Sequence, residues 1–545
     1  MRVAELLVKC LEHEGVEYIF GVPGEENIDF MDALLGSSIE FIVTRHETSA
    51  AFMAGTYGRL TGKPGVCLAT LGPGATNLLT GVANANMDLS PLIAITGQAG
   101  LERQHKISHQ YYDLVSIYDP VTKWNTQIKT GEIIPEVVRK AFQVATKDKP
   151  GATHIDLPED IAAMEMEMEA TPLEMIEHSL SEAGDQVVQQ AVKMIEQAKH
   201  PLILAGNGIT RGKASESLQA LVEKTTIPVV HTFMGKGAIS WKNDLSLLTA
   251  GLGGKDYITC GFNHSDLILA IGFDIAEYPP KNWNPDAATP ILHIDTKEAE
   301  TDANYPVKLN VLGDINTNLR KLNESLSPIE RNNNWVANVR KDALDEYEQF
   351  QGDESFPIKP QKIVSDLRSV LSDEDIVISD VGAHKMWMGR MYHTAQPNTC
   401  LISNGLASMG VAVPGAIAAK MVHPNRHVVA VCGDGAFQMT GAELETAKRL
   451  NLPIIILLWR DEGYGLIEWH QQKKFKRSSH IKFGNPDFIQ LAKAYEFEAI
   501  QIQKGGDLKP ALEKAISLNK PVLIDCPVDY SENMKLTEKL DDIHC

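Results

Sequence analysis

Short apolar runs that break abruptly into glycine, proline or a charged residue are the feature that most limits how this chain can fold. Residues 428–437, "VVAVCGDGAF", are an example in which β-branched and small apolar residues lead directly into a Gly-Asp-Gly triplet. Uninterrupted apolar runs are typical of strands that are covered on both faces, and here they alternate with stretches of helical periodicity. This alternation predicts an α/β protein built from doubly wound parallel sheets with helices on both faces.

The apolar runs fall into three blocks. With 545 residues the chain is too long for one hydrophobic core. Residues 163–186 are acidic and lack apolar periodicity, and residues 325–335, "SLSPIERNNNW", are polar, so both stretches are predicted to be connectors. We therefore predict three domains, which span residues 1–165, 186–330 and 358–545. The predicted strands are residues 17–24, 40–47, 65–74, 91–98, 152–158, 200–208, 227–233, 266–274, 290–297, 375–382, 428–435, 453–461 and 521–529.

Charge and cysteine content exclude several classes of function. The formal net charge of -20 opposes binding to nucleic acid, because such proteins gather Lys and Arg into a basic stripe. The seven cysteines are scattered without CxxC spacing, which fits neither a disulfide framework nor a zinc site and favours a reducing cytoplasm. The first residues do not resemble a signal peptide, and no apolar run reaches the length of a membrane span. We expect a cytoplasmic protein without nucleic-acid or membrane partners.

Two aspartates follow predicted strands of the third block. Asp434 stands between Gly433 and Gly435 at the end of one strand, and Asp461 ends the next strand 27 residues later. One strand-helix-strand unit separates them, so both carboxylates are expected at the same edge of a parallel sheet. Oxygen ligands suit Mg²⁺ or Ca²⁺, and a dication that bridges to phosphate groups would offset the repulsion between the carboxylates. The alternative for a Gly-Asp-Gly triplet alone is a structural turn, and the spacing to the second aspartate favours the metal site.

A Gly-Asp-Gly triplet followed after about 27 residues by Asn or Asp resembles the metal-diphosphate motif of thiamine-diphosphate-dependent enzymes. The resemblance covers nearly the whole chain and implies a pyrimidine-binding, a central Rossmann-like and a diphosphate-binding domain, with thiamine diphosphate and Mg²⁺ as cofactors. Asp461 occupies a position where the family usually has Asn. By the same analogy the backbone carbonyl of Gly463 is the third protein ligand of the ion, and Gly433, Gly435 and Ala436 contact the cofactor.

Glu47 lies just after a predicted strand and at the start of a helix, in the setting "RHETSAAFMA". Similar enzymes have a glutamate here that exchanges a proton with N1′ of the aminopyrimidine ring, which requires a carboxyl group. The alternative is a first-turn glutamate that merely favours the helix dipole. The resemblance also implies a catalytic role for Gln110 and a substrate pocket formed by His109, Lys123 and His470. The cofactor contacts that it implies are Thr70, Pro73, Asn77, Gly382, Ala383, His384 and Met409.

Within the family, the chain is similar to the catabolic, flavin-independent acetolactate synthases. Residues 272–285, "GFDIAEYPPKNWNP", stand where anabolic relatives carry an FAD-contacting stretch, so FAD is not expected. The implied reaction condenses two pyruvate molecules into 2-acetolactate and CO₂ through a thiamine-bound hydroxyethyl carbanion. Glu47 and Asp434 lie in different blocks, and the family places the site between two chains, which implies a homodimer or homotetramer. Another thiamine-diphosphate-dependent 2-oxoacid decarboxylase or carboligase would share these cofactor residues, and a non-enzymatic nucleotide-binding protein is the alternative from a different class.

Overall fold

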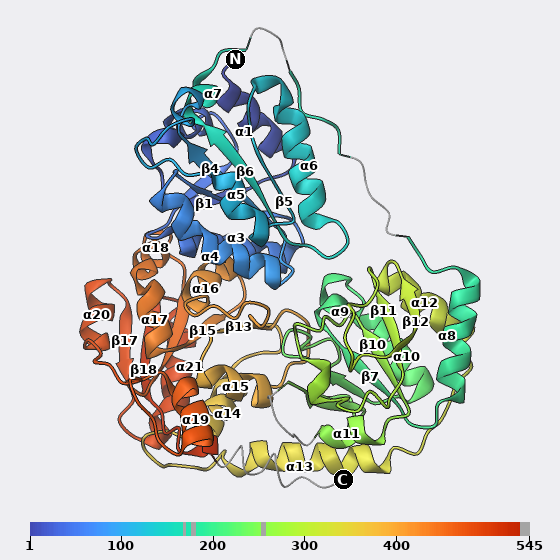
Figure 1. Cartoon of the computed structure of the whole chain (residues 1–545). Coiled ribbons are helices and arrows are strands. Elements are labelled where there is room, and N and C mark those ends of the chain that lie inside the picture. Colours follow the sequence, from blue (N-terminus) through green and yellow to red (C-terminus); the bar gives the residue numbers. More distant parts are fainter. Residues whose placement is uncertain (167–169, 176–180, 252–257, 535–545) are drawn as a thin grey trace. The chain divides into compact units, whose positions relative to one another are not determined.

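Three six-stranded sheets form the framework of the computed structural model, which describes residues 1–166, 170–175, 181–251 and 258–534 (Figure 1). Their strand orders are β2-β1-β3-β4-β6-β5, β12-β11-β10-β7-β8-β9 and β14-β13-β15-β16-β18-β17. The pairings between neighbouring strands are parallel, for example Leu68 with Ile95 and Ile95 with Ile155. The predicted doubly wound parallel-sheet α/β fold is confirmed.

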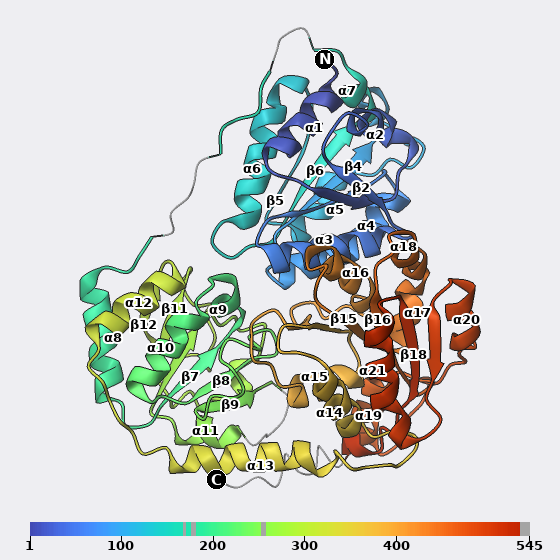
Figure 2. The same cartoon turned by 180° about the vertical axis from the view of Figure 1, so that it is seen from behind.

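The first sheet is covered by helices on both faces. Val66, Leu68 and Ile93 belong to the same buried cluster as the apolar stripes of α1 and α6. Helices α3 and α4 pack against each other, as both views show, and α16 packs on α3 (Figures 1 and 2). The strands are β1 (Tyr18–Gly21), β2 (Glu40–Val43), β3 (Gly65–Ala69), β4 (Leu92–Gln98), β5 (Trp124–Gln127) and β6 (Ala152–Pro158). The helices are α1 (Val3–His13), α2 (Ile28–Leu34), α3 (Glu47–Thr61), α4 (Pro73–Met87), α5 (Leu114–Tyr118), α6 (Ile134–Thr146), α7 (Glu159–Ala163), α16 (Ala412–Val422) and α18 (Leu444–Arg449).

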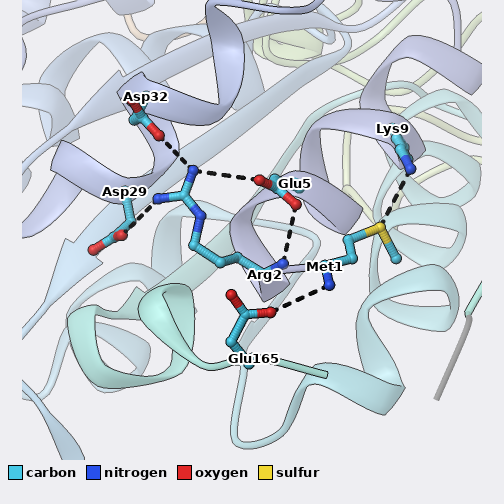
Figure 3. Close-up of polar contacts among 7 residues, drawn as sticks. All are labelled: Met1, Arg2, Glu5, Lys9, Asp29, Asp32 and Glu165. Carbon is cyan, nitrogen blue, oxygen red and sulfur yellow. Dashed lines mark hydrogen bonds and ion pairs between the residues drawn. The ribbon is translucent and has the colours of Figure 1, made fainter. Parts of the chain in front are cut away.

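Polar contacts at the first two residues tie the start of the chain to its surroundings (Figure 3). The Arg2 guanidinium lies between Asp29, at 3.0 Å, and Asp32, and it also contacts Glu5. The terminal ammonium of Met1 donates to Glu165 over 3.2 Å, and Arg2 forms an antiparallel bridge with Glu165. Exposed ion pairs contribute little individually, so the buried apolar face of α1 holds this helix in place.

The second sheet has buried clusters on both faces. Its strands are β7 (Pro201–Ala205), β8 (Val229–His231), β9 (Ser246–Thr249), β10 (Leu267–Ile271), β11 (Ile291–Asp295) and β12 (Val307–Leu312). Its helices are α8 (Asp185–Gln197), α9 (Asn207–Arg211), α10 (Ser215–Thr225), α11 (Thr259–His264), α12 (Ile315–Ser325) and α13 (Asn334–Gln349). Helix α13 begins within the last residues of the second predicted connector and is not among the predicted elements.

The third sheet carries both aspartates that the sequence singled out. Its strands are β13 (Ile376–Ser379), β14 (Cys400–Ile402), β15 (Val428–Gly433), β16 (Ile454–Arg460), β17 (Glu498–Gln501) and β18 (Val522–Pro527). Its helices are α14 (Pro360–Val370), α15 (Ala383–Met391), α17 (Asp434–Thr440), α19 (Gly465–Phe475), α20 (Phe488–Ala494) and α21 (Leu508–Leu518). The central strands are almost fully buried, which is why they appear in the sequence as continuous apolar runs.

The chain divides into two compact units whose boundaries do not follow sequence order. The first unit consists of Met1–His178 together with Gly405–Asn425 and Phe437–Ile454, and the second contains the remaining segments. In the first predicted connector, residues 167–169 and 176–180 lie outside the described residues. No helix in the described part of the chain is both long enough and apolar enough to cross a membrane.

Candidate active site

Two helix starts at the carboxyl edge of the first sheet bring Glu47, Asn77 and Thr70 together. Glu47 is the first residue of α3, and Asn77 lies in the first turns of α4. Asn77 Nδ2 donates a hydrogen bond of 3.1 Å to Glu47 Oε2. A Cβ atom at residue 74, which is a glycine, would lie 2.9 Å from Thr70 Cγ2 and 3.5 Å from Glu47 Oε1. The absence of a side chain at residue 74 therefore allows Thr70 to approach the start of α4 closely.

Thr70 is held by a residue that the sequence did not single out. Its hydroxyl donates to Glu26 Oε2 over 2.7 Å, and Glu26 is buried in the short helix Glu25–Asn27 that follows β1. A Cβ atom at Gly24 would lie 2.3 Å from Thr70 Cβ, so this close approach requires glycine. The run "GVPGEENID" contains both residues, and its glycine followed by acids at a strand end is the local signal that could have identified Glu26.

The loop after β4 carries Gln110 and His109. A Cβ atom at Gly72, whose φ is 54°, would lie 2.8 Å from Gln110 Cβ, so Gln110 packs against the loop that precedes α4. The side chains of His109 and Gln110 are exposed, as is Pro73 at the first position of α4. All three therefore lie where a ligand can reach them from solvent.

The buried end of β4 is hydrogen-bonded to this loop. Gln98 Nε2 donates to the carbonyl of Tyr112 over 3.0 Å and to Asp156 Oδ2 over 3.3 Å. Burial raises the pKa of Asp156 to about 6, although Gln127, Thr96 and Gln98 donate hydrogen bonds to its carboxylate. The polar residues beneath the loop are thus hydrogen-bonded to one another and fix its path.

Lys123 does not join the other predicted pocket residues. It precedes β5 at the amino-terminal edge of the sheet, whereas Glu47 and Thr70 follow strands at the carboxyl edge. Its ammonium donates to the carbonyls of Val144, Lys147 and Lys149 over 2.5, 2.8 and 2.8 Å. These carbonyls lie at the C-terminal end of α6, where a cation satisfies unpaired acceptors and the helix dipole. The structure therefore does not place Lys123 beside Glu47 and Thr70 within this chain.

Met409 lies in a turn that is held at the far end of α4 from Asn77. The amide of Gly405 donates to Asp88 Oδ1 over 2.8 Å, and the amide of Ser408 donates to Asn84 Oδ1 over 3.3 Å. Ser408 directly precedes Met409, and from Asn77 to Asn84, the partner of Ser408, the helix rises about 10 Å. Within the first unit, the turn of Met409 is therefore separated from the neighbours of Glu47.

Asp434 receives hydrogen bonds from the loop after β16. It is the first residue of α17 and is 1% exposed. Its Oδ2 accepts from the amides of Asp461 and Glu462, over 3.2 and 2.7 Å, and from Asn485 Nδ2 over 2.8 Å. The structure thus brings the two aspartates into one site at the carboxyl edge of the third sheet. Asn485 lies in the run "FGNPDF", and its part in the site could not be recognised without the fold.

Burial and the neighbouring Asp434 disfavour the charged form of Asp461. Together they raise the pKa of this carboxyl group to about 7. No group of three or more His, Cys, Asp or Glu side chains suited to a metal occurs among the described residues. An ion here would therefore need other oxygens, such as a backbone carbonyl and phosphate groups. Gly463 follows in the same loop, which pairs with Lys482 in an antiparallel bridge.

His384 lies against the Gly-Asp-Gly triplet. A Cβ atom at Gly433 would lie 3.1 Å from His384 Cε1, and one at Gly382 would lie 2.8 Å from the same atom. The ring is buried, burial lowers its pKa to about 3, and Nε2 has no hydrogen-bond partner within the described residues. Ala383 and His384 are the first two residues of α15, and Gly435 and Ala436 lie in the first turn of α17. An anion beside this ring would stabilise the imidazolium and accept a hydrogen bond, so these residues fit a diphosphate group.

A cavity of about 380 Å³ adjoins Asp461. Helix α19 lines it with Gly465, Glu468, Trp469 and Gln472, which share one helix face. His470 is exposed and is not part of this lining, because it lies two residues from Glu468 and so points to another side of the helix. The structure does not bring His470 together with the residues around this cavity.

Comparison with known proteins bears on the family to which the chain belongs. Family models of thiamine pyrophosphate enzymes match the N-terminal binding domain at residues 1–117, the central domain at 188–322 and the C-terminal binding domain at 380–526. Acetolactate synthase of Bacillus subtilis is 35% identical over 98% of this chain and 94% of its own length. Catabolic acetolactate synthase of Raoultella terrigena is 34% identical over 98% and 97%, and a probable acetolactate synthase large subunit of Methanococcus aeolicus is 36% identical over 98% and 93%. The chain therefore belongs to the family of enzymes that depend on thiamine pyrophosphate, the cofactor also called thiamine diphosphate.

Proposed function

We propose that the protein is an acetolactate synthase, a transferase that condenses two molecules of pyruvate into 2-acetolactate and CO₂. The observation that carries this proposal is the set of relatives with that name, which are 34% to 36% identical over 98% of the chain. The carboxylates, the glycine-rich loops and the buried histidine of the candidate site are the residue types that this chemistry needs.

The metal ion of the proposed enzyme is Mg²⁺, held by Asp434, Asp461 and the carbonyl of Gly463. Burial and the neighbouring Asp434 raise the pKa of Asp461. A dication between the two carboxylates would stabilise the charged form of Asp461, which supports this assignment. Hydrogen bonds from two amides and from Asn485 orient the Asp434 carboxylate. Outer contacts of this kind are typical of metal ligands.

Glu47 is the proposed acid–base group. The bound cofactor supplies a thiazolium ring that accepts the electrons released on decarboxylation. Glu47 holds a proton at its carboxyl group and exchanges it with a ring nitrogen. The hydrogen bond from Asn77 to Oε2 keeps this carboxylate at the carboxyl edge of the sheet and leaves Oε1 beside Gly74. Gln110 and His109, on the neighbouring loop, are proposed to contact the substrate.

His384 is proposed to contact the diphosphate group together with Gly382, Ala383 and the residues that flank Asp434. Its buried Nε2 and its position against Gly433 support this role. The cofactor contacts proposed in the first unit are Thr70, Pro73, Asn77 and Met409. Thr70 is the most firmly placed of these, because its hydroxyl is fixed by the buried Glu26.

The active form is proposed to be a homodimer or a homotetramer. Within the first unit the turn of Met409 is held at one end of α4, and Glu47 lies near the other. A site that uses both residues therefore draws them from different copies of the chain. Exposed apolar side chains on the loop after β4, namely Leu101, Ile107 and Tyr112, offer apolar surface to such a partner.

The proposed enzyme does not need FAD. In Rossmann-like sheets a dinucleotide phosphate binds the amides that follow a strand. Here the amide of Asn207, just after β7, donates to the buried carboxylate of Glu277 over 3.1 Å. A Cβ atom at Gly208 would lie 2.4 Å from Gly272 Cα, so the two loops are in close contact. Glu277 thus occupies a place that a phosphate group would need.

A product assay tests the proposal. Purified protein is supplied with ¹³C-labelled pyruvate, thiamine diphosphate and Mg²⁺, and products are followed by nuclear magnetic resonance. We expect labelled 2-acetolactate and CO₂, no flavin absorbance in the protein, and about 100-fold less product or lower from Glu47→Gln. Accumulation of acetaldehyde would identify a decarboxylase instead, and CO₂ release from a different 2-oxoacid alone would show that pyruvate is the wrong substrate.

A further inference from the structure

We propose that Glu443 is a positioning residue for Glu47: its buried side chain fixes the turn from which α3 begins. The inference deepens the proposed function and rests on it, because it assigns Glu47 the acid–base role. Glu443 is in the first unit, at the end of the short helix Gly441–Glu443, and lies 398 residues from Arg45 in sequence. Neither the motif around Asp434 nor the region around Glu47 identifies it.

The amides at the start of α3 are satisfied by this distant carboxylate. Glu443 Oε1 accepts hydrogen bonds from the backbone amides of Arg45 and His46, over 3.0 and 3.2 Å. His46 is the N-cap of α3, and a helix start leaves the amide at this position without a partner inside the helix. In a capping box, the third helical residue is Glu or Gln and reaches back to the capping residue. That position in α3 is Ser49, so Glu443 supplies from elsewhere the acceptor that the helix itself lacks.

Burial makes these contacts strong and specific. Glu443 is 0% exposed, and its Oε2 accepts from the Thr446 hydroxyl over 2.7 Å. A buried carboxylate is costly unless donors surround it, so the side chain and the turn hold each other in one arrangement. Burial also raises the pKa of Glu443, as expected for a carboxyl group removed from water.

Residues 443–449 also contact the end of β2, on the other side of this turn. Arg449, six residues after Glu443, donates to the carbonyl of Val43, the last residue of β2, and to Glu445 Oε1. One short stretch therefore accepts from the amides of Arg45 and His46 and donates to the carbonyl that precedes them. Glu47 follows His46 directly, so its backbone position is set by these contacts. Acid–base groups need accurate placement, and a displacement of about 1 Å can lower turnover about 100-fold.

The test compares Glu443→Ala with the conservative Glu443→Gln and with Glu346→Ala as matched control. Glu346 is another buried carboxylate, bound to Arg390 over 2.6 Å in a different part of the chain. In protein without cofactor, hydrogen–deuterium exchange of the peptide spanning residues 43–49 should increase in Glu443→Ala. It should stay unchanged in Glu346→Ala and in Glu443→Gln, since a carboxamide oxygen can still accept both amides.

Kinetics separate positioning from general stability. We expect Glu443→Ala to lower kcat about 10- to 100-fold, with the KM for pyruvate and the affinity for thiamine diphosphate within about twofold of the original values. Glu443→Gln should restore most of the turnover. Because Glu443 acts through Glu47, the double variant Glu47→Gln/Glu443→Ala should lose no more turnover than Glu47→Gln alone.

Three results would overturn the inference: unchanged exchange at residues 43–49, unchanged kcat in Glu443→Ala, or losses that multiply in the double variant. If Glu443→Ala does not fold, Glu443→Asp replaces it in the test. The side chain of Asp is one methylene shorter, so its carboxylate lies farther from the amides of Arg45 and His46. This variant should give an intermediate loss of turnover and of protection from hydrogen–deuterium exchange. Full activity of Glu47→Gln would refute the acid–base role proposed for Glu47, and absence of 2-acetolactate from the original protein would refute the proposed function. The exchange experiment would still show whether Glu443 holds the turn.

Discussion

Replacing Asn485 with alanine tests the proposed metal site through a residue that is not itself a proposed ligand. Asn485 Nδ2 donates over 2.8 Å to Asp434 Oδ2, the oxygen that also accepts the amides of Asp461 and Glu462. Removing a partner that orients a metal ligand typically weakens metal binding by about 10- to 100-fold, or about 1.4 to 2.7 kcal/mol. Asn485 is only partly buried, so water can replace part of its hydrogen bond. We therefore expect about a 10-fold loss of Mg²⁺ affinity.

Titration calorimetry at fixed pH and ionic strength, with thiamine diphosphate in excess, measures this loss. The matched control is Asn323→Ala, because Asn323 is also partly buried and donates one hydrogen bond, over 2.9 Å to the carbonyl of Ser217 near the second sheet. The control should bind Mg²⁺ as the original protein does. Equal affinity for Asn485→Ala and the original protein, with both folded, would refute the reasoning that Asn485 orients Asp434.

Four further predictions follow from individual contacts. Glu47→Gln should keep cofactor affinity in calorimetry but lose about 100- to 10,000-fold in kcat, since a carboxamide cannot exchange the proton; near-original turnover would contradict the role. Asp434→Ala should abolish the Mg²⁺ dependence of cofactor binding in the same titration, and an unchanged dependence would exclude it as a ligand. Lys123→Met should lower the free energy of unfolding, measured by urea denaturation, by about 1 to 3 kcal/mol, because it leaves carbonyls at the end of α6 unpaired. A raised KM for pyruvate without lost stability would instead support a role of Lys123 in the substrate pocket. Burial raises the pKa of Glu277 to about 7, so its protonated form favours the folded state below the ordinary carboxyl pKa and this stabilisation is lost as pH rises through about 7. The free energy of unfolding of the original protein should therefore fall by about 2 to 3 kcal/mol more than that of Glu277→Gln between about pH 5 and pH 8. Parallel pH profiles of the two proteins would contradict this prediction.

The central strands could be predicted because burial on both faces leaves a local pattern. Every predicted strand appears in the structure, including β15 and β16, which end directly before the two aspartates. The five strands without a prediction, β5, β9, β12, β14 and β17, all lie at sheet edges. Two of them, β5 with "WNTQ" and β17 with "EAIQ", are partly exposed and polar. The sequences of these two strands therefore do not differ clearly from those of loops.

The sequence by itself determined the parallel-sheet fold, the position of Glu47 at a helix start and the spacing that brings Asp434 and Asp461 to one edge. These features are local, because strand burial, helix periodicity and the length of one strand-helix-strand unit are all written within a few tens of residues. Only the tertiary structure decided that Glu26 holds Thr70, that Asn485 and two amides orient Asp434, that Glu443 caps α3, and that Lys123 closes the end of α6. Each of these polar contacts joins residues that belong to different helices, strands or loops. Hydrogen bonds of this kind depend on which loops the packed sheets bring together, and no local pattern encodes that choice.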